Sequence, residues 1–63
     1  MAEVTYPCYW MRKDARGEWR WTYYARNAEP IAVSSEGYKR REDCSHSISL
    51  VKASNGDSVF FTE

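Results

Sequence analysis

The sequence predicts a small α+β protein, with an antiparallel β-sheet, one helix against one face of the sheet, and the element order β-β-β-α-β. Three observations lead to this prediction. In the first half of the chain, the side chains fall on alternating faces with the two-residue period of strands. Apolar residues with helical spacing follow, and the last segment is short and apolar. With 63 residues, we expect a single domain spanning residues 1–63.

The first half predicts three strands. Residues Cys8 to Lys13 form the first, and Pro7 is tolerated at its start. A hairpin turn, KDARGE, follows, because Asp and Gly favour tight turns. Glu18 to Ala25 form the second strand, since aromatic side chains suit a half-buried pleated surface. After the turn RNAE, the segment PIAVS at 30–34 forms the third.

The second half predicts one helix, from about Arg40 to Ala53. Cys44, Ile48 and Val51 recur at helical spacing and form one narrow apolar stripe. Three serines and a histidine make the segment a poor helix former, so the helix needs packing against the sheet.

The sequence predicts the end of this helix more clearly than its start. The run Lys39-Arg40-Arg41 places basic charge at the positive end of the helix dipole and offers no capping oxygen, so we expect a late start. Asn55-Gly56 predicts a left-handed exit. The segment DSVFFTE at 57–63 is expected to form the last strand.

Five aromatic residues lie between Gly17 and Tyr38, and Trp19, Trp21 and Tyr23 share one face of the second strand. Such a row is either the core or a platform for bases. Each buried ring removes about 150–250 Å² from water, so a domain this short needs the rings inside. The predicted core is Trp19, Trp21, Tyr23, Ile31, Val33, Ile48 and Val51.

Size makes a partner chain the expected support for this fold. Ordering a chain of 63 residues costs roughly 95 kcal/mol at about 1.5 kcal/mol per residue, which a small core hardly offsets. Cys8 and Cys44 are the only cysteines, and with His46 they provide too few ligands for a closed zinc site. We expect no disulfide, metal or other cofactor, and we expect a symmetric homodimer.

Charge and hydropathy exclude some partners. Nine basic and nine acidic residues give a formal net charge of zero, so no overall field attracts nucleic acid. No apolar run approaches the roughly 20 residues that a membrane span needs. The start of the chain lacks the apolar core of a signal peptide, and we expect a cytoplasmic protein.

Several short motifs together resemble the YegP-like family of small, mostly bacterial proteins, which carry a domain of unknown function. The matching residues are Lys13-Asp14, Gly17-Glu18, Trp19-Arg20-Trp21 and Ser35-Glu36-Gly37-Tyr38. The resemblance covers about Tyr9 to Val51. It implies a β(3)-α-β unit that is repeated in tandem or forms a homodimer, in which two units build one continuous sheet and exchange their last strands. It implies no activity and no catalytic residues.

The face of the sheet away from the helix is the candidate binding surface. There we expect Trp10 and Arg12 from the first strand beside Arg20 and Tyr24 from the second. Aromatic rings interleaved with arginines occur in single-stranded nucleic-acid binders. The alternative is a solvated face on which Arg20 lies over Trp10 or Tyr24 as a cation–π pair. Lys39, Arg40 and Arg41 are a second candidate phosphate contact.

No constellation of catalytic residues is recognisable. Cys44 and His46 are two positions apart, so a helix points them to different sides. We interpret Cys44 as a buried apolar residue and His46 as an exposed polar residue. Gly37 is interpreted as the source of an unusual backbone angle. The leading hypothesis is a non-enzymatic module that acts by binding a protein or small molecule. The alternative is a weak single-stranded nucleic-acid-binding protein.

Overall fold

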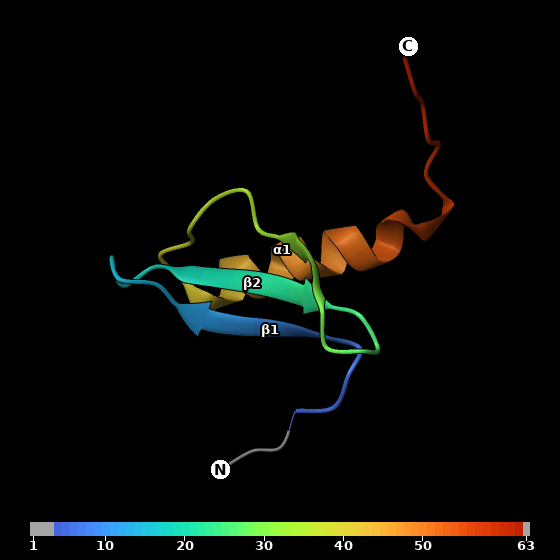
Figure 1. The fold of residues 1–63 in the computed structure, drawn as a ribbon. Helices are drawn as coiled ribbons and strands as arrows, with labels where there is room; N and C mark the ends of the chain where they lie inside the picture. The colour runs from blue at the N-terminus through green and yellow to red at the C-terminus, as the bar shows by residue number, and fades with distance from the viewer. Residues whose placement is uncertain (1–3, 63) are drawn as a thin grey trace.

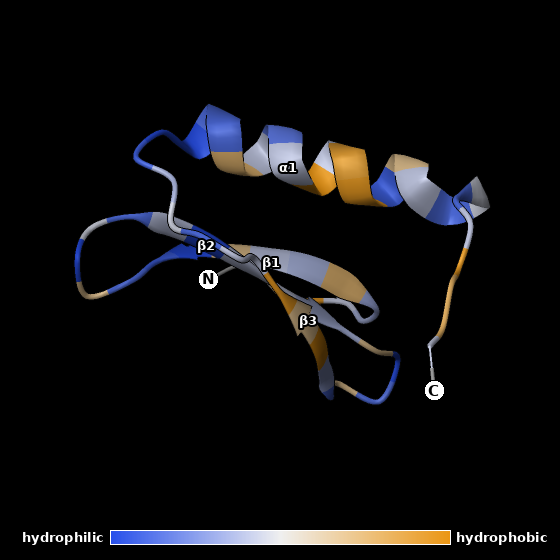
Figure 2. Cartoon of the chain, turned by 90° about the horizontal axis from the view of Figure 1, so that it is seen from above, coloured by the Kyte–Doolittle hydropathy of each residue, from blue (hydrophilic) through white to orange (hydrophobic). Residues whose placement is uncertain are grey.

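The computed structural model describes residues 4–62 and confirms the α+β class. Its elements are β1 (Cys8–Lys13), β2 (Trp19–Tyr24), β3 (Pro30–Val33), α1 (Arg41–Ala53) and the 3-10 turn η1 (Ser54–Gly56). The strands form one antiparallel sheet in the order β1-β2-β3 (Figure 1). Figure 2 shows α1 along one side of this sheet. Residues 1–3 and Glu63, at the ends of the predicted domain, lie outside the described residues.

Asp14 organises the turn between β1 and β2. One carboxylate oxygen, Oδ1, accepts the backbone N–H groups of Arg16 at 2.9 Å and Glu18 at 3.0 Å. The Asp14 carbonyl accepts the Gly17 N–H at 3.0 Å, and Gly17 adopts a φ of +79°, which glycine tolerates without a steric penalty. The predicted hairpin is therefore confirmed, and the turn fixes the register of the two strands.

In β3, Val33 points away from the helix, whereas the sequence predicted that Ile31 and Val33 would point toward it. Thr22 pairs with Val33 and Tyr23 with Ala32, so Val33 shares the side of Thr22, away from the helix. The register shifts between Tyr23 and Tyr24, which leaves Ile31 as an extra residue. Ile31 and Val33 are 64% and 66% exposed, so placing them in the core was wrong.

The core lies between β2 and α1. Trp21 is 6% exposed, and its indole Nε1 donates a hydrogen bond to Ser47 Oγ at 2.9 Å. Cys44 is fully buried, as predicted. Among residues 4–62, Trp21 and Cys44 are the only hydrophobic residues that are fully or almost fully buried, and the other large apolar side chains are half-buried or exposed.

The remaining core predictions have mixed outcomes. Trp19, Tyr23 and Ile48 are half-buried on the helix side of the sheet, and the rings of Tyr9 and Tyr23 lie 4.6 Å apart. The interpretation of the aromatic row as core is therefore confirmed. Val51, 40% exposed, was wrongly assigned to the core.

The helix ends at Ala53, as predicted, and begins one residue after Arg40, in line with the expected late start. Arg40 occupies the N-cap position, in extended conformation and without a side-chain hydrogen bond, so α1 begins at Arg41. The exit is η1, and neither Asn55 nor Gly56 has a positive φ, so the predicted left-handed exit is wrong. The Ser54 hydroxyl instead donates to the Val51 carbonyl at 2.6 Å.

Gly37 serves a close approach rather than an unusual backbone angle. Its φ is not positive, and a Cβ atom there would meet Glu18 Oε1 and lie 2.9 Å from Glu18 Cβ. The interpretation from sequence was therefore wrong. The contact lets Tyr38 reach Trp19, where the two backbones exchange hydrogen bonds as an isolated bridge.

The C-terminal segment does not form the predicted strand in the single chain. Residues 57–62 pair with no strand of the described chain, and Figure 1 shows them leading away from the sheet and the helix. Val59, Phe60 and Phe61 are 94%, 88% and 87% exposed. A strand is stabilised by its pairing, and these residues have no neighbour to pair with. Glu63, the last residue of the predicted strand, is outside the described residues.

Two further findings bear on the environment of the protein. Cys8 and Cys44 are both free thiols. Within residues 4–62, no helix has the length and apolar character needed to cross a membrane.

Candidate functional site

The strand register brings four of the predicted site residues onto one surface. Arg12 lies directly opposite Arg20, and Trp10 lies directly opposite Thr22. Tyr24, two residues beyond Thr22, points to the same side. Trp21 packs under the helix on the other side, so these five side chains occupy the face away from α1. We call this surface the open face; it consists of Trp10, Arg12, Arg20, Thr22 and Tyr24.

Arg12 links the two aromatic rings of the open face. Its Cζ atom lies 5.3 Å from the centre of the Trp10 ring, and its Nη2 donates to the Tyr24 hydroxyl at 3.1 Å. The rings of Trp10 and Tyr24 are 6.1 Å apart, and Tyr6 meets Tyr24 edge-on at 5.6 Å. The expected cation–π pair therefore forms, but with Arg12 in place of Arg20.

Arg20 is held by the turn instead. Its Nε donates to Asp14 Oδ2 at 2.7 Å, and the two side chains are 42% and 23% exposed. This hydrogen bond from Arg20, followed by the one from the Glu18 amide, holds the pKa of Asp14 below its ordinary value. From the sequence, Asp14 was predicted only to stabilise the turn and not to pair with Arg20. The spacing Asp14-x5-Arg20 across a hairpin is a signal that could have revealed the pair.

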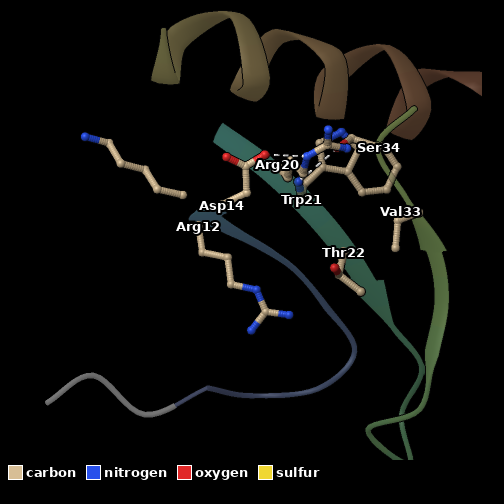
Figure 3. Close-up of a pocket in the computed structure, with 8 residues that line it drawn as sticks. Arg12, Asp14, Arg20, Trp21, Thr22, Val33 and Ser34 are labelled. Carbon is tan, nitrogen blue, oxygen red and sulfur yellow. Dashed lines mark hydrogen bonds and ion pairs between the residues drawn. The ribbon is translucent and has the colours of Figure 1, made fainter. Parts of the chain in front are cut away.

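A hollow of about 330 Å³ lies on this face, shown in Figure 3. Its lining residues are Arg12, Lys13, Asp14, Arg20, Trp21, Thr22, Val33 and Ser34. Three cationic residues and one carboxylate make the lining electropositive. Its size is at the lower end of the range for small-molecule sites.

The basic run is not part of the open face. Lys39, Arg40 and Arg41 are exposed at the start of α1, on the covered side of the sheet. Arg41 borders a second hollow of about 480 Å³, with Met11, Glu42, Ser45, His46 and Ser49. The structure thus divides the seven predicted site residues into two separate groups.

Cys44 and His46 lie on α1 and are not part of the open face. Burial raises the pKa of the Cys44 thiol, which disfavours the reactive thiolate. His46 is exposed on the helix, as predicted. The chemistry available at the open face is therefore recognition, through guanidinium groups, a hydroxyl and aromatic rings.

The fold and this face define a small sheet-and-helix protein with arginine and aromatic side chains gathered on the face away from its helix. A family model described as a domain of unknown function (DUF1508) matches residues 14–60. The chain belongs to this family, and its resemblance to the YegP-like proteins is confirmed.

Two bacterial relatives have a similar sequence. The UPF0339 protein NMB1088 of Neisseria meningitidis serogroup B is 46% identical over 41 residues, covering 65% of this chain and 71% of the relative. The UPF0339 protein NMA1193/NMA1859 of serogroup A gives the same identity and coverage. Neither description names an activity.

Proposed function

We propose that the protein is a cytoplasmic homodimeric module that acts by binding and is not an enzyme. The observation that carries the dimer is the exposed C-terminal segment. Val59, Phe60 and Phe61 expose nearly their whole side chains, although burying one such side chain contributes about 1.5–3 kcal/mol. The free thiols Cys8 and Cys44 suit the reducing cytoplasm.

The proposed dimer follows from two complementary features of one chain. Within residues 4–62, the outer sides of β1 and β3 are unpaired edges of the sheet, and all four residues of β3 are exposed. Residues 57–62 pair with no strand of the described chain, and an extended conformation there places Val59 and Phe61 on one side and Phe60 on the other. An extended segment added to a sheet edge satisfies both sets of backbone groups. Two copies exchanging this segment would build one continuous sheet, the arrangement implied by the YegP-like resemblance.

A charge substitution in the segment tests the proposed exchange. In the double variant Val59→Asp, Phe61→Asp, two carboxylates replace the side chains that a partner would bury. We expect the variant to be monomeric at concentrations where the wild type is dimeric. The matched control is Ala15→Asp, an exposed position in the first hairpin, which should stay dimeric. A variant that dimerises as strongly as the wild type would contradict strand exchange.

Single-stranded nucleic acid is a second candidate ligand, supported by the arrangement of Trp10, Arg12 and Tyr24. Two rings flank one guanidinium, and Trp10 is 37% exposed. A base stacked on an exposed ring contributes about 1–3 kcal/mol. The formal net charge of zero argues for weak binding.

A tryptophan-fluorescence titration with single-stranded DNA and RNA oligomers tests this candidate. Binding predicts saturable quenching that weakens between low and near-physiological salt. Trp10→Leu should abolish the quenching. Replacing Lys39, Arg40 and Arg41 together with Ala distinguishes the open face from the basic run at the helix start. A flat response from folded protein would exclude this candidate.

A further inference from the structure

Two arginines face each other across the strands of the open face. Arg12 and Arg20 are direct cross-strand partners, a placement that is unfavourable for like charges. Asp14 neutralises Arg20, whereas the hydrogen bond and the cation–π contact that Arg12 forms within residues 4–62 are with the neutral groups of Tyr24 and Trp10. The two residues therefore add excess positive charge to this face of a protein whose formal net charge is zero.

Both guanidinium groups are positioned before any ligand arrives. Arg12 is fixed by the Tyr24 hydroxyl and the Trp10 ring, and Arg20 is fixed through its Nε by Asp14. Such preorganisation lowers the entropic cost of binding. In residues 4–62, the two terminal nitrogens of Arg20 and the Thr22 hydroxyl form no hydrogen bond within the chain. These donors border the hollow of about 330 Å³ (Figure 3).

We propose that this hollow binds the phosphate group of a small phosphate monoester, with Arg12 and Arg20 as the principal donors and Thr22 as an additional one. Guanidinium groups match the geometry of phosphate oxygens, and charge-assisted hydrogen bonds of this kind are the strong ones. A dianion offsets the repulsion between the two arginines. Val33 and the nearby Trp10 ring offer apolar surface to the remainder of the ligand.

The site is formed by one chain and does not depend on the homodimer. Its lining residues all belong to the β1–β2 hairpin and the end of β3 with the following Ser34. It shares the open face with the nucleic-acid candidate but requires a single phosphate group. A monomeric protein that binds phosphate monoesters would contradict the dimer and leave this site intact.

Chemical-shift titration of the wild-type protein tests the site, with phenyl phosphate and inorganic phosphate as probes at constant ionic strength. We expect saturable shifts centred on Arg12, Arg20 and Thr22, with tighter binding of phenyl phosphate. Arg12→Gln and Arg20→Gln should each weaken binding about tenfold or more, and Thr22→Val by less. The matched control Arg26→Gln removes an exposed arginine of the second turn and should bind like the wild type.

Several outcomes would overturn the proposal. These are shifts that do not saturate, shifts centred on Lys39 to Arg41, or equal weakening by Arg26→Gln and Arg12→Gln. An unphosphorylated oligothymidine that binds more tightly than phenyl phosphate through Arg12 and Arg20 would assign the site to a nucleic-acid backbone. Arg20→Gln also removes the ion pair with Asp14, so Arg12→Gln, which leaves that pair in place, provides the independent test.

Discussion

The indole nitrogen of Trp21 donates a hydrogen bond to the hydroxyl of Ser47, 2.9 Å away, and Ser47 in turn donates to the Cys44 carbonyl at 2.7 Å. This relay joins the centre of the sheet to the helix at the most buried part of the protein. A helix with one narrow apolar stripe is thus also anchored by a polar contact.

Removal of the Ser47 hydroxyl is expected to destabilise the protein. In Ser47→Ala, the buried Trp21 N–H loses its acceptor, which costs about 1–3 kcal/mol. Thermal unfolding followed by circular dichroism measures the loss. The matched control is Ser49→Ala, because the exposed Ser49 hydroxyl bonds only to the Ser45 carbonyl of its own helix. Equal stability of the two variants would show that the relay does not support the fold.

A better helix cap is expected to stabilise the protein. Arg40 already has the extended backbone of an N-cap residue but provides no capping oxygen. Arg40→Ser should therefore add about 1 kcal/mol to the free energy of unfolding, measured by urea titration. Lys39→Ser removes the adjacent positive charge without a cap and is the control. A gain of the same size in both variants would attribute the effect to charge alone.

Replacing Ala28, in the turn between β2 and β3, with glycine is expected to stabilise the protein. Ala28 has a φ of +68°, a conformation that costs a residue with a Cβ roughly 1–2 kcal/mol. Glycine avoids this cost and loses part of the gain to its freer unfolded state. We expect Ala28→Gly to raise the midpoint of thermal unfolding by a few degrees. The same substitution at the exposed Ala15, which has no positive φ, should not. A lower midpoint of thermal unfolding for Ala28→Gly than for the wild type would contradict the positive φ at Ala28.

The ion pair between Asp14 and Arg20 predicts an acid-sensitive contribution to stability. The folded protein lowers the pKa of Asp14, mainly through the hydrogen bond from Arg20. The contribution is thus fully present above the unfolded pKa of about 3.9 and is lost as pH falls through the folded value. The stability difference between wild type and Asp14→Asn should be constant near neutral pH and shrink below about pH 4.

Unfolding at a series of pH values measures this difference. Glu36→Gln, in the exposed loop after β3, is the control and should differ little from the wild type at any pH. A difference between Asp14→Asn and the wild type that is independent of pH would show that the carboxylate charge does not contribute.

The sheet, the helix and the aromatic core could be predicted because each has a local pattern. The alternating side chains of β2 and the helical spacing of Cys44 and Ile48 specify the elements, and the Asp14 to Gly17 turn specifies the hairpin. The facing of β3 could not be predicted in this way. The alternating sequence around Ile31 and Val33 fits the sheet whether these two side chains face the helix or face away from it. The β-bulge that decides between the two depends on how β3 pairs with β2, which the local sequence does not specify.

The sequence predicted which residues share the open face, but it could not predict which of them contact one another. Alternation places Trp10, Arg12, Arg20 and Tyr24 on one side, and the structure agrees. Which arginine stacks on the rings depends on where Asp14 holds its partner, and that requires the geometry of the turn. The separation of the open face from Arg41 likewise depends on which side of the sheet the helix covers.

The solution mass of the wild-type protein across a dilution series, measured by light scattering or native mass spectrometry, tests the central claim most directly. For a homodimer we expect twice the chain mass of 7.4 kDa in the micromolar range, with dissociation only on further dilution. A mass of one chain at every micromolar concentration would contradict the homodimer and leave the exposed segment Val59 to Phe61 without its proposed partner.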